Sequence, residues 1–433
     1  MEVGQANPPP SPVRAGGAAA MTRRRRFTVI ATLYLVADLG YAFLFGALNT
    51  ILLAGGLRLE QLALVNLLGL IYMGRFLVGP LVDRVGFGRL GRYRGWLMIT
   101  QLLLVLVWLA MAPLDPVGDL TVVLLLTAVG LVISAVHDTA MNGFAVRLLP
   151  PQDRGMGNGI QAGMASTSIV IGSGGALLLY AHAGWGVTVG ALAALFLVPF
   201  GVLLFVTEPA AGPEARRTVP FAEMATFFRQ RRVRTWTLLV VPFFALGGYL
   251  ATAVQAPMML AAHWSLERIA LVQGTLAGLV GCAAAFGVGA LVTRLGVRRT
   301  ALLVGVFWVC ALSLSLPLSL GGSSAVLDTA SVLAVTAGYA GMGVCVFTVA
   351  MDLARPASAA TDFTLQISVL GVLRLAMTSA GLAVAGAAGF PPLISASVLL
   401  AAAGTWITTR WLRGHPTSSD SFEPDPTEQR ELA

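Results

Sequence analysis

Long apolar segments alternate with short polar ones along most of the chain. Twelve of them are close to the length of about 20 residues that a helix needs to cross a membrane. They cover residues 28–53, 61–82, 96–113, 120–148, 159–181, 185–206, 236–260, 268–293, 299–319, 328–353, 361–386 and 391–412. Polar alternation typical of barrel strands is scarce, and helices satisfy their own backbone hydrogen bonds in lipid. The pattern predicts an all-α membrane protein with twelve transmembrane helices.

Composition supports a lipid environment. Of the 433 residues, 57% are hydrophobic and 11% are charged, whereas soluble domains carry about 25% charged residues. Cys282, Cys310 and Cys345 lie in apolar segments, and their spacing suits neither a zinc site nor a disulfide framework, so we interpret them as packing residues. No metal-ligand cluster, nucleophile elbow or phosphate loop is visible, which predicts no metal, no cofactor and no enzymatic activity.

The charges predict the orientation. The net charge is +8, and all 28 basic residues are arginine. They lie between apolar segments and not on one polar face, which argues against a nucleic-acid partner. With both termini in the cytoplasm, Arg58 and Arg268 lie outside and Arg75 and Arg374 within spans, leaving 24 of the 28 on the cytoplasmic side. The positive-inside rule therefore predicts a multi-pass protein of the cytoplasmic (inner) membrane with cytoplasmic termini.

An internal repeat divides the chain. "GPLVDRVG" (79–86) matches "GALVTRLG" (289–296), and "TAMN" (139–142) matches "VAMD" (349–352), both 210 residues apart. Two matches at one offset predict a duplicated six-helix unit, and two parallel units around a central site are typical of alternating-access transporters. A membrane scaffold without transport is the alternative. The predicted parts are a disordered leader 1–26, a bundle 27–207, a cytoplasmic linker 208–234 with an amphipathic piece near 221–232, a bundle 235–412 and a disordered tail 413–433.

Polar residues gather between the tenth and eleventh spans. Pro356 ends one helix, and Thr361 or Asp362 can cap the next by accepting a hydrogen bond from a free backbone N–H group. Gln366 lies about one turn inside the eleventh span, and Gln161 is its counterpart in the fifth. The two glutamines either form a gate or join helices by hydrogen bonds.

Three charged residues lie deep within apolar spans: Asp38, Asp138 and Arg374. A charge at this depth costs about 2.5–3.5 kcal/mol unless it faces a cavity or a partner. One or both aspartates are expected to carry a proton, and Arg374 to bind an anionic substrate group or to pair with an aspartate; a static ion pair is the alternative. Arg75 can extend toward the cytoplasm, as a substrate attractor or a structural contact.

Other polar residues complete the candidate substrate or proton site. Besides the charges and glutamines above, they are Asn142, Gln255, Tyr339 and Asp352. Gln255 and Tyr339 either line the cavity or pack between helices.

Three stretches resemble the major facilitator superfamily: "RFLVGPLVDR", "DTAMNGFAVRLLPPQDRGMGNGIQ" and "MDLARPASAATDFTLQ". The resemblance extends over about 28–412 and is strongest to permeases for rhizobactin- or pyochelin-type ferric siderophores, with muropeptide permeases and acetyl-CoA transporters as sister branches. It implies the major facilitator fold and a clasp that closes the cytoplasmic side, in which Asp83 is attracted to the positive end of the eleventh span. The expected clasp residues are Asp83, Arg84, Gly86, Arg147 and Asp362.

We therefore expect a secondary active transporter that imports a polar organic solute together with a proton, a symporter whose small-molecule substrate is, by resemblance, a ferric siderophore. An exporter, a muropeptide-like permease and a non-transporting assembly protein are the alternatives. The partners expected are the substrate, the proton and the lipid bilayer.

Overall fold

The computed structural model describes residues 21–208, 226–265, 268–269, 271–322 and 324–417. All regular elements in these ranges are helices. The predicted leader up to residue 20, the tail from residue 418, and linker residues 209–225, with part of the predicted amphipathic piece, lie outside the described residues.

The first bundle is built from six spans. Its first span begins at Arg23, so the four arginines form the first turn of a helix whose N-cap is Thr22. The elements are α1 (Arg23–Tyr34), α2 (Leu39–Phe43), η1 (Leu44–Leu48) and α3 (Asn49–Ala54); α4 (Leu59–Asn66), α5 (Gly69–Met73), η2 (Gly74–Val78) and α6 (Gly79–Arg84); α7 (Tyr93–Met111); α8 (Leu120–Leu148); α9 (Arg154–Val170), η5 (Ile171–Gly175) and α10 (Ala176–Leu204).

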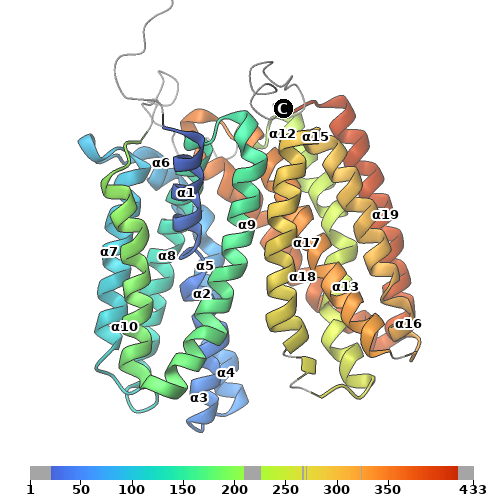
Figure 1. Cartoon of the computed structure of the whole chain (residues 1–433), viewed down its shortest axis with the longest axis horizontal. Helices are drawn as coiled ribbons and strands as arrows, with labels where there is room; N and C mark the ends of the chain where they lie inside the picture. Colours follow the sequence, from blue (N-terminus) through green and yellow to red (C-terminus); the bar gives the residue numbers. More distant parts are fainter. Residues whose placement is uncertain (1–20, 209–225, 266–267, 270, 323, 418–433) are drawn as a thin grey trace, which may run out of the picture.

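The second bundle repeats this plan. Its elements are α12 (Arg231–Thr235), η7 (Trp236–Val240) and α13 (Val241–Ala261); η8 (Leu271–Leu276), α15 (Ala277–Ser313) and α16 (Leu316–Ser319); α17 (Ala325–Leu353); α18 (Ala359–Ala388); and α19 (Phe390–Gly414). Figure 1 shows the two bundles next to each other.

The described residues contain nine helical stretches long and apolar enough to cross a membrane. Two of these stretches hold two spans each, because the chain reverses at Gly184 (φ 77°) and at Gly296 (φ 76°). A positive φ strains other residues, so glycine permits the reversal. The remaining span, residues 59–84, is divided into short helices. The predicted twelve-span, all-α architecture is confirmed.

The offset of the repeat differs from span to span. The ends of α8 and α17 differ by 205 residues, as do Gly184 (φ 77°) and Gly389 (φ 85°). The prediction that "TAMN" is equivalent to "VAMD" is therefore wrong, because residues 139–142 are equivalent to 344–347. The 210-residue offset holds only for the second span, since the first bundle has a longer segment between α6 and α7 where the second has the break at Gly296.

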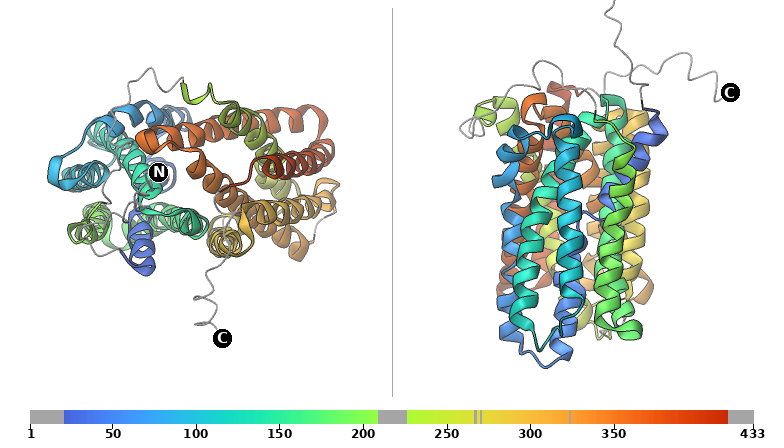
Figure 2. Two further views of the ribbon diagram at one scale, coloured as in Figure 1. Left: turned by 90° about the horizontal axis from the view of Figure 1, so that it is seen from above. Right: turned by 90° about the vertical axis from the view of Figure 1, so that its left-hand side faces the viewer.

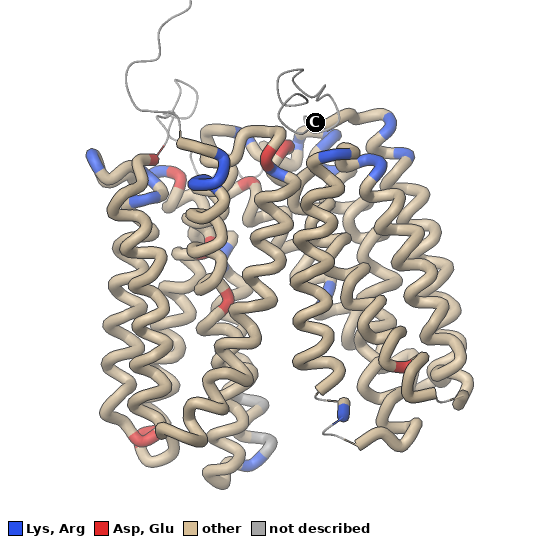
Figure 3. The backbone as a smooth tube through the Cα atoms, viewed as in Figure 1, with Lys and Arg blue, Asp and Glu red and all other residues tan. Residues whose placement is uncertain are grey.

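Charge distinguishes the two ends of the molecule. We call the end that carries Arg23 and Thr417 the basic end, and the end with Arg58 and Arg268 the far end. Figure 3 shows most blue segments at the basic end and few within the bundles. The view from above in Figure 2 shows the helices of the first bundle on the left and those of the second on the right.

The bundles pack together at the basic end. There α9 packs on α15 so closely that a Cβ on Gly289 would lie 2.9 Å from the carbonyl oxygen of Gly155 and from Cα of Gly159. One buried apolar cluster draws Val82 and Phe144 from the first bundle and Phe363 from the second. This end is closed.

Toward the far end the bundles separate. In α18 nearly every residue from 359 to 370 is buried, whereas from 372 to 388 only Gly381 is. The partly buried side chains of this stretch, such as Leu373 and Met377, pack on the core of the second bundle, and the contacts of α18 with the first bundle are made mainly with η2, α6 and α8. The structure is therefore closed at the basic end and open at the far end.

Candidate functional site

A chain of polar contacts runs through the first bundle. Asp138 on α8 accepts hydrogen bonds from Arg75 Nη1 (2.8 Å) and from Asn142 Nδ2 (3.1 Å). Asn142 in turn accepts one from the Tyr34 hydroxyl at 2.9 Å. Arg75 therefore does not extend to the basic end; it points into the bundle, where it neutralises Asp138.

The chain of contacts continues from Arg75 to Asp38. The Arg75 guanidinium lies 5.1 Å from the Tyr72 ring centroid, and the Tyr72 hydroxyl donates to Asp38 Oδ1 at 3.1 Å. Tyr72 and Tyr34 were not predicted, because tyrosines inside an apolar span do not stand out as polar partners. The signal available was the spacing of Tyr72, three residues before Arg75, which places both on one helix face.

Asp38 occupies a break in the first span. The α1 helix ends at Tyr34 and α2 starts at Leu39, with Asp38 at φ −98° and ψ 9° between them. Interrupted helices are typical of binding sites in transporters. Among the described residues, Asp38 makes no ion pair. The single arginine pairs with Asp138 and not with Asp38, so a proton on Asp38 would make the group of three charges neutral.

The second bundle contributes a cation. Arg374 on α18 is exposed; its Nη1 lies 3.3 Å from the Tyr339 hydroxyl, and its guanidinium lies 5.6 Å from that ring's centroid. Tyr249 of its own bundle and Tyr41 of α2 lie close to Arg374. Arg374 therefore faces the space between the bundles. The expected pair with an aspartate is absent among the described residues.

Asp83 joins the bundles at the basic end. Its carboxylate accepts hydrogen bonds from the N–H groups of Ala360 (3.2 Å) and Thr361 (2.8 Å) and from the Thr361 hydroxyl (2.5 Å). It also accepts one from the Tyr93 hydroxyl at 2.5 Å. A carboxylate from one bundle thus satisfies free N–H groups in the first turn of α18 in the other.

The predicted cap of the eleventh span is wrong. The α18 helix begins at Ala359, and neither Thr361 nor Asp362 caps it. Asp362 lies in its first turn, where it accepts three hydrogen bonds from Arg355, through Nε (2.7 Å), Nη2 (2.8 Å) and the backbone N–H (3.0 Å), and a fourth from the Ser358 hydroxyl. The prediction failed because the capping carboxylate, Asp83, is distant in sequence.

The other residues expected in the clasp or the site at the basic end are Asp352, Arg147, Arg84 and Gly86. Asp352 forms an ion pair with Arg154 on α9, which joins the bundles and places Asp352 away from the central charges. Arg147 binds Glu208 at 3.0 Å and lies 4.6 Å from the Tyr93 ring centroid. Arg84 and Gly86 are exposed beside Asp83. Arg154 was not predicted, since an arginine at that end also fits the general charge bias.

The glutamines are buried, and each has one polar atom without a partner. Gln366 Nε2 donates to the carbonyl oxygens of Ala350 and Asp362 (3.1 Å each), which joins α18 to α17 within one bundle. The atoms without partners in the described part of the chain are Oε1 of Gln161 and Gln366 and Nε2 of Gln255. His137, beside Asp138, points elsewhere and lies 3.2 Å from Gln101.

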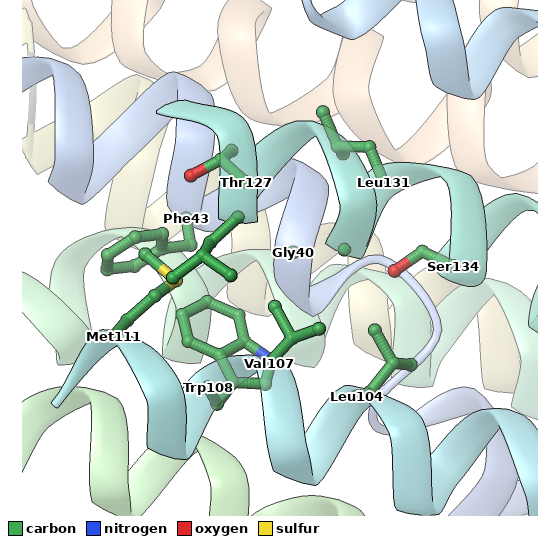
Figure 4. A pocket seen from close by; sticks show the side chains of 11 residues that line it. Gly40, Phe43, Leu104, Val107, Trp108, Met111, Thr127, Leu131 and Ser134 are labelled. Carbon is green, nitrogen blue, oxygen red and sulfur yellow. The ribbon is translucent and has the colours of Figure 1, made fainter. Parts of the chain in front are cut away.

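A small pocket in the first bundle is separate from these charges. Figure 4 shows Phe43, Trp108 and Met111 around it, with Thr127 and Ser134 on α8. Its volume is about 20 Å³, which holds about one water molecule. The pocket is too small for an organic substrate.

Comparison with known proteins identifies the family. The model of the Major Facilitator Superfamily matches residues 30–385. The chain belongs to the major facilitator superfamily. This major facilitator protein is accordingly a multi-pass membrane transporter.

Two curated relatives are similar over much of the chain. The anhydromuropeptide permease of Escherichia coli K12 is 27% identical over 287 residues, covering 65% of this chain and 58% of the permease. An uncharacterized protein of Haemophilus influenzae is 25% identical over 345 residues, covering 73% of this chain and 80% of that protein. The match therefore spans less than two thirds of the permease.

Three solved structures share the fold. A bacterial homologue of the iron transporter ferroportin, in an outward-facing state, has a TM-score of 0.67 at 17% identity, over 90% of this chain and 99% of that chain. The human organic anion transporter MFSD10 gives 0.69 at 15%, over 89% and 99%. The transporter FucP in its outward conformation gives 0.62 at 16%, over 90% and 98%.

Proposed function

We propose that this major facilitator protein imports an anionic, polar organic solute of the muropeptide class together with a proton. The observation that carries the proposal is the position of Arg374, which is exposed between the bundles beside Tyr339 and within electrostatic reach of Tyr41. An exposed guanidinium between tyrosines is suited to bind a carboxylate and the apolar face of a sugar. Muropeptides combine sugar and carboxylate groups, and the curated permease above supports this class.

We propose that the protein lies in an inner membrane of the bacterial type with its basic end facing the cytoplasm. It is supported by the positive-inside rule, since Arg58 and Arg268 are the arginines near the far end. In this orientation the structure is open to the outside and closed to the cytoplasm. Substrate would then enter from the far end and reach Arg374 before the bundles rearrange.

Asp38 is proposed as the proton carrier. Asp138 is held by Arg75 and Asn142, whereas Asp38 accepts only from Tyr72 among the described residues. A carboxyl without a cationic partner can gain and lose a proton at least cost as the cavity changes its access to water. Movement of the proton down its gradient would then accompany inward transport.

The coupling is tested with the full chain in liposomes. For Asp38→Asn we expect loss of uptake driven by an inward pH gradient, while exchange of labelled for unlabelled anhydromuropeptide continues. Asn keeps the shape and an acceptor oxygen but cannot carry the proton. Asp119→Asn, at the far end of the first bundle, is the control. Gradient-driven uptake at the level of the unmodified protein in Asp38→Asn would reject the proton role.

The substrate class is tested at Arg374. A hydrogen bond to a charged group contributes about 1.5–3 kcal/mol, so Arg374→Ala should raise the Kd for an anhydromuropeptide by about 10- to 100-fold. Arg58→Ala, at the far end, should leave it unchanged. Equal affinity in Arg374→Ala would remove this residue from the site.

A ferric siderophore is the second candidate, favoured by the resemblance of "TDFTLQ" and "GNGIQ" to siderophore permeases. Binding of an iron-loaded siderophore, and not of an anhydromuropeptide, to the purified protein would select it.

A further inference from the structure

A groove at the basic end lies outside the central site. It is lined by Arg23, Arg24, Phe27 and Ala31 of α1, Ile160 of α9 and Phe286 of α15. The α9 helix packs against both α1 and α15, and Figure 1 shows α9 between them. The volume of the groove is about 600 Å³, within the range of sites that bind small molecules.

Charge is concentrated at the top of this groove. Asp153 accepts hydrogen bonds from both Arg23 (2.8 Å) and Arg26 (2.7 Å), so one acid is shared between two arginines. Arg24 is exposed, and its guanidinium makes no hydrogen bond or ion pair with any residue described in the structure. The N–H groups in the first turn of α1 add positive potential. The top of the groove therefore favours an anion.

The rest of the groove is apolar and follows the membrane normal. Arg23 and Ala31 are eight residues apart on α1, which corresponds to about 12 Å along the helix. Below the arginines the lining is mostly apolar, and Phe286 packs on α9, where a Cβ on Gly163 would lie 2.7 Å from its ring. A free phosphate would leave this wall uncovered, whereas a molecule with a charged head and an alkyl chain would cover it.

We propose that this groove binds one anionic phospholipid, with its phosphate at Arg23 and Arg24 and an acyl chain against Phe27, Ala31 and Phe286. Arginines at a membrane surface attract acidic lipids, and basic pockets between transmembrane helices bind lipid head groups. The lining comes from both bundles, so the bound lipid lies across their junction. It would stabilise the arrangement in which the basic end is closed.

The proposal is tested by native mass spectrometry of the full chain in detergent, with phosphatidylglycerol and phosphatidylcholine of identical acyl chains. We expect one phosphatidylglycerol to be retained where phosphatidylcholine is lost. Arg23→Gln with Arg24→Gln should weaken that retention by about tenfold or more. Arg410→Gln with Arg413→Gln removes the same charge from exposed positions at the end of α19 and should leave it unchanged.

Two further arms keep the outcome decisive. Arg24→Gln alone leaves the Arg23–Asp153 pair intact, so a loss of phosphatidylglycerol there cannot come from that pair. Ala31→Trp fills the apolar wall and keeps every charge, and it should also reduce retention. An equal loss of phosphatidylglycerol in the Arg410/Arg413 control would mean that the lipid is held by diffuse attraction to surface arginines, and it would overturn the proposed site. Competition by glycerol 3-phosphate at concentrations equal to the lipid would show a headgroup-only site and would equally overturn it.

Discussion

The Arg75–Asp138 pair shows what single residues contribute to this transporter. Both members lie within one bundle, and Asn142 and Tyr34 satisfy further hydrogen-bonding groups around them. Removing one partner of a buried pair leaves an uncompensated charge, which costs about 3–5 kcal/mol, whereas replacing both can be nearly neutral.

We expect Asp138→Leu and Arg75→Met each to lower the melting temperature of the purified protein substantially. The double variant should recover much of that loss, because neither charge is left alone. Thermal unfolding of the four proteins in one detergent measures the coupling. Losses that simply add in the double variant would show that the two side chains do not stabilise each other.

At the scale of residues, the sequence indicated the charges but not their partners. Asp38, Asp138 and Arg374 stand out because each interrupts an apolar run. Which residues they contact depends on how helices distant in sequence pack, so the Arg75–Asp138 pair and the role of Tyr72 could not be predicted. Asp352 was expected in the substrate or proton site, but the structure pairs it with Arg154.

At the scale of elements, the contact between α9 and α15 depends on glycines, which carry no side chain. Gly159 and Gly289 meet with no space for a methyl group on either helix, and the atoms that a Cβ would meet belong to the backbone. Backbone atoms cannot move aside as a flexible side chain can. The two helices must therefore separate if either glycine gains a Cβ.

Gly289→Ala should shift the protein toward states with an open basic end, at a cost to the closed state of about 1–3 kcal/mol. Gly287→Ala is the matched control, since nothing lies within 4 Å of a Cβ at that position two residues away. Spin labels at Arg89 and Arg299, with the native cysteines replaced, report the distance between the bundles. An unchanged distance distribution in Gly289→Ala would contradict the role of this contact.

The helices themselves were the part of the fold that the sequence predicted best. Apolar length alone identifies a span, because a membrane leaves few alternatives to a helix. The internal breaks were missed, such as the one at Asp38, since they are set by the neighbours and not by local composition. The repeat offset was wrong for residues 139–142 because four-residue matches between apolar helices arise by chance.

At the scale of the whole molecule, one carboxylate of the first bundle binds the start of a helix in the second bundle. Asp83 binds the amides of Ala360 and Thr361, and the equivalent position of the second bundle is Thr293. The closed state therefore has this contact on one side only. Those two amides belong to the first turn of α18, where no earlier carbonyl of the same helix can accept them.

Asp83→Asn should accelerate hydrogen exchange at the amides of residues 360 and 361. An amide side chain offers a single neutral acceptor oxygen in place of the carboxylate. Mass spectrometry of a peptide covering the start of α18 measures the rate, with Asp119→Asn as the control. Protection equal to that of the unmodified protein would mean that the rest of the interface alone keeps this end shut.

The offsets of the repeat give Arg75 and Asp138 counterparts in the second bundle. Ala285 is equivalent to Arg75, and Gly343 to Asp138. The first bundle thus has an ion pair where the second has small, uncharged residues. The second bundle is therefore built with Ala and Gly at these two places. A variant with Arg75→Ala and Asp138→Gly would test whether the first bundle stays stable without the ion pair.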